Sequence, residues 1–196
     1  MRKIPKVLTE DQQQALLQSF NERYVTPKRN KLMVRLMLNA GLRLAETLDL
    51  DWSNLDTERA IVDVRAGKGD KDRRLFLDEQ FATSLSIWER KEVEWLGEQP
   101  NYVFTTGNNT RINPRYVRAM VKRQCNRADL PDWVHPHTFR HTFATDLYKK
   151  SKDIRMVQKA LGHADLSTTM IYTHIVDDEL EDALKSFRAR KEPVKA

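Results

Sequence analysis

Helical periodicity runs through most of this chain, and one strand–turn–strand pattern interrupts it. Apolar residues recur at helical spacing before and after that interruption. Residues 60–64 and 74–77 read as two strands, and Gly67–Asp70 supplies the turn between them. The predicted helices cover residues 9–20, 31–39, 42–50, 79–96, 114–127, 137–150, 153–161, 166–173 and 177–190. The pattern predicts a mainly α fold with one small antiparallel β-sheet, which is an α+β class.

Capping residues and helix breakers set the limits of these elements. Thr9 and Gln12 have the spacing of a capping box, and Asn113–Pro114 has the cap-then-proline order of a helix start. Pro27 predicts a break before the apolar run, and Gly41 predicts an interruption after it. Gly162 is expected to end the helix over 153–161. Residues 102–104 are expected to form a short strand.

Composition excludes several classes of protein. The chain of 196 residues has one cysteine, so an internal disulfide and a cysteine-based zinc site are excluded. It shows no secretory signal and no apolar run long enough to span a membrane. A mean hydropathy of −0.67 is typical of a soluble, charge-rich globular protein. We therefore expect a cytoplasmic protein.

The net charge of +6 is concentrated in one region. Residues 101–150 carry nine Lys and Arg against three Asp and Glu, whereas the remainder of the chain is balanced. On the predicted helix over 114–127, Arg115, Arg118 and Lys122 form a basic stripe apart from an apolar one. Such a patch indicates a polyanion, with nucleic acid first and an anionic membrane second. A solvated basic helix face is the simpler alternative.

Several reactive side chains stand out, although each has an ordinary explanation when taken singly. In a helix, His137 and Arg140 share a face and can meet one anion. His163 directly follows the expected helix stop, and Tyr172 comes nine residues later. Arg43 follows the Gly41 interruption, and Lys68 lies at the tip of the predicted hairpin. A lone tyrosine usually packs, a turn lysine is usually solvated, and Arg43 could simply pair with Glu46 along a helix.

Taken in order, these residues resemble the catalytic domain of the tyrosine recombinase, or phage integrase, family. Four stretches carry the resemblance: AGLRLAETLDLDW (40–52), GKGDKDRRLFL (67–77), HPHTFRHTFATDLY (135–148) and LGHADLSTTMIYTH (161–174). The family order is Arg, Lys, His-x-x-Arg, His, Tyr. The positions of this chain that match it are Arg43, Lys68, His137, Arg140, His163 and Tyr172.

The chemistry of this family makes sense of the inventory. A phenol ionises near a pKa of ~10, so Tyr172 needs an electropositive site to act as a nucleophile. Two arginines can hold a phosphate and stabilise its transition state, and imidazoles can move protons near neutral pH. The resemblance implies that Lys68 is the general acid for the 5′-oxygen and that Glu46 orients the first arginine. It also implies a 3′-phosphotyrosyl intermediate, rejoining without ATP, and exchange through a Holliday junction.

The same resemblance sets expectations for cofactors and partners. It implies double-stranded DNA as substrate and no cofactor, with a homo-oligomer on DNA that is a tetramer in synapsis and a monomer possible without DNA. His137 and His141 have the spacing of two zinc ligands, but a third ligand is not obvious, so we expect no metal and a packing or hydrogen-bonding role for His141. The helix over 177–190 is expected to dock on a neighbouring subunit, or alternatively on its own domain.

The resemblance covers residues 8–185, so we expect one catalytic domain over 1–196, with a core over 8–176 and no N-terminal core-binding domain. This could be a stand-alone domain or a fragment, of prokaryotic, viral or plasmid-borne origin. The leading prediction is a site-specific recombinase of the integrase or invertase type. A relaxing enzyme with type IB topoisomerase chemistry, or a DNA-binding accessory protein with the same fold, are the alternatives.

Overall fold

The computed structural model describes residues 5–65, 72–173 and Lys185. Its helices are α1 (Glu10–Gln18), α2 (Val25–Ala40), α3 (Leu44–Leu48), α4 (Glu79–Leu96), α5 (Pro114–Arg127), α6 (Pro136–Ser151) and α7 (Ile154–Leu161). Short 3-10 turns are η1 (Trp52–Asn54), η2 (Leu166–Thr168) and η3 (Met170–Tyr172). Strands β1 (Leu55–Asp56), β2 (Ile61–Val64) and β3 (Arg73–Phe76) complete the element order. The predicted fold class is confirmed. Within the described ranges, no helix is both long enough and apolar enough to cross a membrane.

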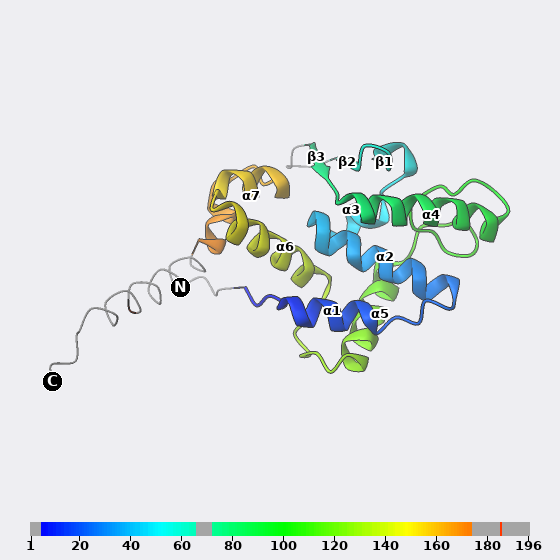
Figure 1. Cartoon of the computed structure of the whole chain (residues 1–196), viewed down its shortest axis with the longest axis horizontal. Helices are drawn as coiled ribbons and strands as arrows, with labels where there is room; N and C mark the ends of the chain where they lie inside the picture. The colour runs from blue at the N-terminus through cyan, green and yellow to red at the C-terminus, as the bar shows by residue number, and fades with distance from the viewer. Residues whose placement is uncertain (1–4, 66–71, 174–184, 186–196) are drawn as a thin grey trace, which may run out of the picture.

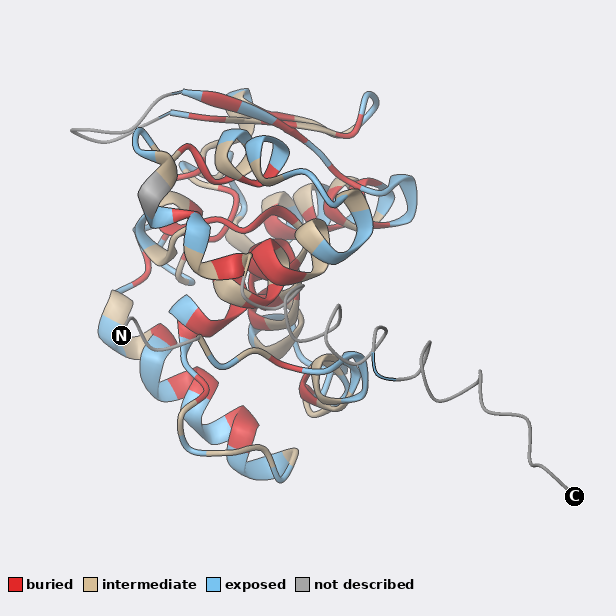
Figure 2. Ribbon diagram, turned by 90° about the vertical axis from the view of Figure 1, so that its left-hand side faces the viewer, coloured by how far each residue is buried: buried red, intermediate tan, exposed pale blue. Residues whose placement is uncertain are grey.

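Helix α2 forms the centre of the molecule because most residues of its second half are apolar and buried. Met33, Val34, Leu36 and Met37 are fully buried, and α2 packs along α6 (Figure 1). Burying four such side chains stabilises the fold by about 1.5–3 kcal/mol each. The three strands form an antiparallel sheet in the order β1-β2-β3 at one edge of this helical core (Figure 2).

Gly41 controls how α2 ends and how closely α6 can approach it. Its φ of 62° lies in the left-handed region, where a side chain is disfavoured. A Cβ atom at this position would lie 2.2 Å from the Phe143 ring of α6. The expected interruption at Gly41 is therefore present, and it lets the chain turn directly into α3.

Three sequence-based expectations about local structure were wrong, and one short strand was missed. Pro27 does not break a helix but lies in the first turn of α2, where its missing N–H has no intrahelical partner to lose. Residues 102–104 form no strand, because the nearest pairing is a single bridge between Thr105 and Arg111. The segment 166–173 forms the two turns η2 and η3 instead of one helix. Strand β1 was not expected at all, because two residues give no detectable alternation.

A second, smaller core lies beside the main one. It consists of the buried residues Ala144, Val157, Leu161 and Tyr172, which come from α6, α7 and η3. The last part of the described chain is thus packed against the helix that carries His137 and Arg140.

Candidate active site

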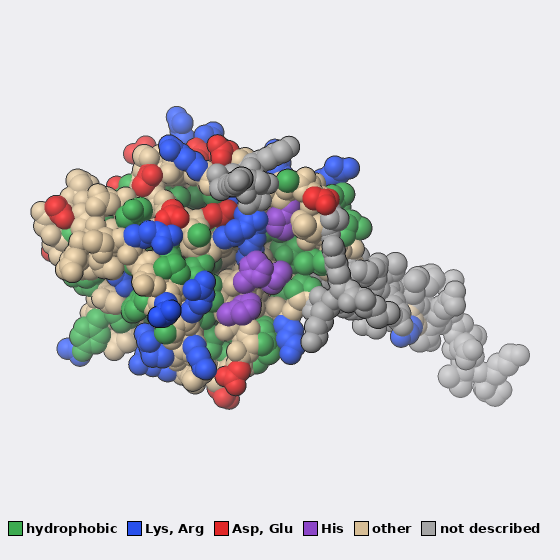
Figure 3. Space-filling model, turned by 180° about the vertical axis from the view of Figure 1, so that it is seen from behind, with side chains coloured by type: hydrophobic (Ala, Val, Ile, Leu, Met, Phe, Trp, Pro, Cys, Tyr) green, Lys and Arg blue, Asp and Glu red, His purple; other side chains and the backbone are tan. Residues whose placement is uncertain are grey.

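A pocket of about 260 Å³ opens where α2 ends and α6 begins. It is lined by Leu42, Arg43, Leu44, Arg118, His135, Pro136, His137 and Arg140. No acidic side chain is among its lining residues, so its chemistry is that of an anion site. Figure 3 shows His side chains gathered on one face of the molecule, with Lys and Arg side chains close to them.

Arg43 takes its position from the start of α3, where it is the N-cap residue. Its backbone N–H donates to Glu46 Oε2 at 2.7 Å, and its Nη1 donates to Glu46 Oε1 at 3.0 Å. The Glu46 carboxylate therefore accepts a hydrogen bond from the N-cap N–H group of α3 and holds the Arg43 side chain at the same time. The Arg43 side chain remains 32% exposed, so it can contact a ligand in the pocket.

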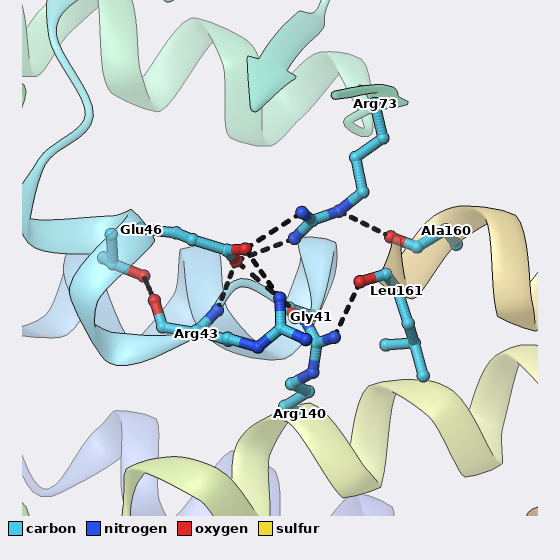
Figure 4. Close-up of polar contacts among 8 residues, drawn as sticks. Gly41, Arg43, Glu46, Arg73, Arg140, Ala160 and Leu161 are labelled. Atoms are coloured by element: carbon cyan, nitrogen blue, oxygen red, sulfur yellow. Dashed lines mark hydrogen bonds and ion pairs between the residues drawn. The ribbon is translucent and has the colours of Figure 1, made fainter. Parts of the chain in front are cut away.

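Arg140 is almost completely buried beneath the pocket and ties two helix ends together. Nη1 donates to the Gly41 carbonyl and Nη2 to the Leu161 carbonyl, both at 2.7 Å (Figure 4). These carbonyls end α2 and α7, where the backbone lacks helical partners. Burial and the nearby charge of Arg43 lower the pKa of Arg140 to about 10, so it stays protonated at neutral pH.

Arg73 is the part of this cluster that sequence reasoning missed. It comes from β3, and its Nη1 and Nη2 donate to the two carboxylate oxygens of Glu46 at 3.0 and 2.7 Å. Its Nε donates to the Ala160 carbonyl at 2.9 Å, and its side chain is 2% exposed. The available signal was alternation, because Arg73 shares the inward face of β3 with Leu75.

Glu46 is the single carboxylate that these arginines surround (Figure 4). Burial alone would raise its pKa, but the hydrogen bonds and charge of Arg73 oppose this effect. With further contributions from the Arg43 N–H and the charge of Arg140, the pKa falls to about 2. Glu46 is therefore ionised at every physiological pH, and its negative charge interacts with the three surrounding arginines.

His163 lies outside the pocket that Arg43, His137 and Arg140 share. It follows Gly162, the left-handed residue at φ 69° that ends α7, as expected. Its Nδ1 lies 3.0 Å from Thr169 Oγ1. His163 lines an adjacent pocket of about 550 Å³ between β3 and α7, together with Arg73 and Gly162.

Tyr172 is buried, and its hydroxyl does not line either pocket. The hydroxyl lies 2.8 Å from Nδ1 of His141, on α6. Burial raises the pKa of Tyr172 to about 12, and the charge of Arg140 opposes this rise. The structure therefore holds a protonated phenol close to, but not inside, the cationic pocket.

The remaining predicted positions fall into two groups. Lys68 lies outside the described residues, as does the predicted helix over 177–190 apart from Lys185. On α5, the side chains of Arg115, Arg118 and Lys122 are exposed, while the apolar stripe faces the core. Arg118 alone among the three also lines the pocket. Across the described part of the chain, no three His, Cys, Asp or Glu side chains are grouped so that they could hold a metal ion.

Comparison of the sequence with known proteins gives consistent matches. Residues 6–179 match the family described as "Phage integrase family". A tyrosine recombinase of Thermosipho africanus is 38% identical over 185 residues, which are 94% of this chain and 62% of that protein. The tyrosine recombinase XerC of Pseudomonas putida is 39% identical over 175 residues, 89% of this chain and 57% of the relative. The chain thus spans about three-fifths of the length of these relatives.

Comparison of the fold gives the same result. The crystal structure of the XerH site-specific recombinase, in a post-cleavage complex with a palindromic difH substrate, superimposes with a TM-score of 0.81. The match has 30% sequence identity and covers 95% of this chain and 54% of that chain.

Replacing Arg73 tests whether the buried cluster holds the site together. Arg73→Ala leaves Arg43 as the closest partner of Glu46, so we expect the free energy of unfolding to fall by about 3 kcal/mol. The neighbouring Arg74 is the matched control, because it and its partner Asp63 are both solvent-exposed. Arg74→Ala should leave stability nearly unchanged. Urea titration measures both; equal effects of the two variants would contradict this assignment.

Proposed function

The chain belongs to the phage integrase family of tyrosine recombinases, and from this premise we propose that it is the catalytic domain of a site-specific DNA recombinase. The observation that carries the proposal is the pocket lined by Arg43, His137 and Arg140, with the Tyr172 phenol nearby. The proposed reaction cleaves one DNA strand and rejoins it to another without metal or ATP.

The pocket supports binding of a phosphodiester. Arg140 is fixed by two carbonyls and Arg43 by Glu46, so both guanidinium groups are oriented before DNA binds. Donors that are already in place stabilise developing charge on the non-bridging oxygens without reorganisation. His137 lines the same pocket, and its burial, together with the charge of Arg140, lowers its pKa in the free chain.

We assign the nucleophile to Tyr172. Attack of its hydroxyl oxygen on phosphorus forms a 3′-phosphotyrosyl bond and releases the 5′-oxygen, which must gain a proton. The family resemblance assigns that proton to Lys68, with His163 as a further hydrogen-bond donor, and both assignments stay predictions. A 5′-hydroxyl of the partner strand then attacks the phosphotyrosyl bond, so the energy of the original bond is conserved.

Because Tyr172 is buried in the free chain, DNA binding has to bring its hydroxyl and the scissile phosphate together before attack. A nucleophile withheld until DNA is bound also protects the protein from futile reactions. Assembly of several copies on paired DNA sites is proposed on the same family basis.

Helix α5 is proposed to lie on DNA. Its exposed Arg115, Arg118 and Lys122 form the outer face, and Arg118 extends this face to the rim of the pocket. The structurally similar XerH recombinase is bound to DNA in its crystal structures, which supports the same class of substrate here. The basic face would then set the register of the duplex over the pocket.

The most direct test of the proposed function is a covalent adduct. Wild-type protein is mixed with a duplex that has a nick close to the cleavage site. Cleavage releases a short fragment that carries the 5′-hydroxyl, and this fragment diffuses away, so rejoining is prevented. Denaturing electrophoresis then detects the protein–DNA product. We expect the wild-type chain to form the adduct and Tyr172→Phe to form none. Because Phe only removes the hydroxyl, the variant should bind DNA with nearly unchanged affinity. An adduct that persists in this variant would mean that another residue attacks.

Neutralising the α5 face tests the DNA-binding surface. Replacing Arg115, Arg118 and Lys122 with Gln should weaken binding and reduce the slope of log K against log salt by about 0.9 for each phosphate that the protein no longer neutralises. The matched control replaces Arg90 and Lys91, which are exposed on α4 and do not line the pocket of the site. Fluorescence anisotropy at several salt concentrations measures both slopes. An unchanged slope in the α5 variant would place its basic face away from DNA.

A further inference from the structure

His141 lies between the cationic pocket and the tyrosine hydroxyl. It is one helical turn from His137 on α6, and the two imidazole rings meet edge to face with centroids 4.5 Å apart. His137 lines the pocket, whereas His141 does not. On its other side, His141 Nδ1 lies 2.8 Å from the hydroxyl of Tyr172. His141 is thus an imidazole in direct contact with the proposed nucleophile.

The direction of this hydrogen bond follows from the surroundings of the two groups. Burial lowers the pKa of His141 to about 4, and positive charge on several neighbours acts in the same direction. These neighbours are His135, His137 and Arg140 on or beside α6, and His163 after α7. A neutral imidazole has one donor and one acceptor nitrogen. A protonated phenol can donate to Nδ1, so we assign the phenol as the donor and Nδ1 of His141 as the acceptor, which places the imidazole proton on Nε2.

We propose that His141 is a further catalytic residue, which orients the Tyr172 hydroxyl and accepts its proton when the phenol oxygen attacks DNA phosphorus. This inference rests on the proposed function. In the step, the phenol O–H bond breaks and the proton passes to Nδ1, while the O–P bond forms. The P–O5′ bond breaks, and the 5′-oxygen takes a proton from a general acid or from water. Rejoining reverses the transfer, and His141 returns the proton to Tyr172.

DNA itself would switch His141 into a better base. A phosphate in the pocket adds negative charge beside the His137–His141 pair, and a nearby opposite charge favours the protonated imidazole. In the free chain, the positive charges of Arg140 and Arg43 act without that compensation. Proton acceptance is thereby coupled to occupancy of the pocket, so the phenol is not activated before substrate arrives.

The test measures adduct formation in single-turnover reactions of the full chain from pH 5 to pH 9. Three variants are compared with wild type: His141→Asn, His141→Leu and His137→Asn. An Asn Oδ1 atom can accept the phenol hydrogen bond near the position of Nδ1, but it cannot take the proton. We expect His141→Asn to react at least 10²-fold more slowly, about the usual size of a general-base effect. Because bound DNA raises the pKa of His141 in wild type, the wild-type rate should rise with pH, and His141→Asn should lose that rise. His141→Leu should react at least as slowly as His141→Asn. His137→Asn should keep the rise in rate with pH.

A substrate with sulfur in place of the bridging 5′-oxygen separates the base from the acid. A thiolate leaving group needs no proton, so this substrate restores variants that lack a general acid. It should leave His141→Asn slow. Restoration of His141→Asn by this substrate, or a wild-type rate in that variant, would overturn the proposal. A reaction of His141→Leu that is faster than that of wild type would also overturn it, because His141 would then only restrain Tyr172.

A measurement without DNA distinguishes failure of this inference from failure of the proposed function. Wild-type protein that forms no adduct would refute the recombinase activity itself. In the free chain, ¹⁵N NMR of labelled histidine reports which ring nitrogen carries the proton. We expect His141 to be neutral at pH 7 with its proton on Nε2, and this preference should weaken in Tyr172→Phe, which lacks the donor. A proton on Nδ1 in the wild-type chain would remove the acceptor and refute the assignment.

Discussion

The site depends on one half-buried carboxylate, that of Glu46, surrounded by more positive charge than it can neutralise. Glu46 pairs with Arg43 and Arg73 directly, and Arg140 Nη1 lies 3.9 Å from its Oε2 atom. Three guanidinium groups and one carboxylate leave a positive excess in a region with little solvent. Such an excess is unfavourable in the free protein: burial, and after it the charge of Arg43, lowers the pKa of Arg140. An entering phosphate supplies the missing negative charge. The uncompensated positive charge that lowers the stability of the free protein therefore favours binding of an anion.

The cluster also explains how distant elements meet at the site. Arg73 and Arg140 bind the carbonyls of Ala160 and Leu161, so β3 and α6 both hold the end of α7. The loop with His163 begins directly after that end. Arg140 additionally holds the Gly41 carbonyl, and Gly41 allows the chain to reach Arg43 within two residues. Arg140 therefore connects its own helix, α6, to the ends of α2 and α7, and its displacement would affect all three elements.

Sequence reasoning recovered the features that are encoded locally. The capping box at Thr9, the stops at Gly41 and Gly162, and the two faces of α5 depend on residues within about four positions of each other. The hairpin strands are equally local, although Arg73 belongs to β3 and was left out of it. The resemblance then identified Arg43, His137 and Arg140, which the structure brings into one pocket.

The features that sequence reasoning missed depend on contacts between distant residues. The Glu46–Arg73 pair spans 27 positions and the His141–Tyr172 hydrogen bond spans 31. Alternation along β3 marks Arg73 as inward-facing, and a hydrogen-bonding role was expected for His141, but neither partner could be named, because the partner is set by how β3, α6 and η3 pack. The burial of Tyr172 likewise arises from the small core between α6 and α7. Its reactivity in the free chain therefore could not be judged from the sequence.

The central claim is that the arginine cluster acts on the negative charge of the scissile phosphate. It is tested most directly by measuring cleavage rates of wild type and Arg140→Ala on two duplexes that differ only at the scissile position. One carries the normal phosphodiester, and the other carries an uncharged methylphosphonate. Loss of Arg140 should slow cleavage of the phosphodiester by about 10²–10³-fold, as for loss of an oxyanion donor, and should slow the methylphosphonate less than about tenfold. An equal loss on both substrates would contradict the account, because Arg140 would then act only through the fold.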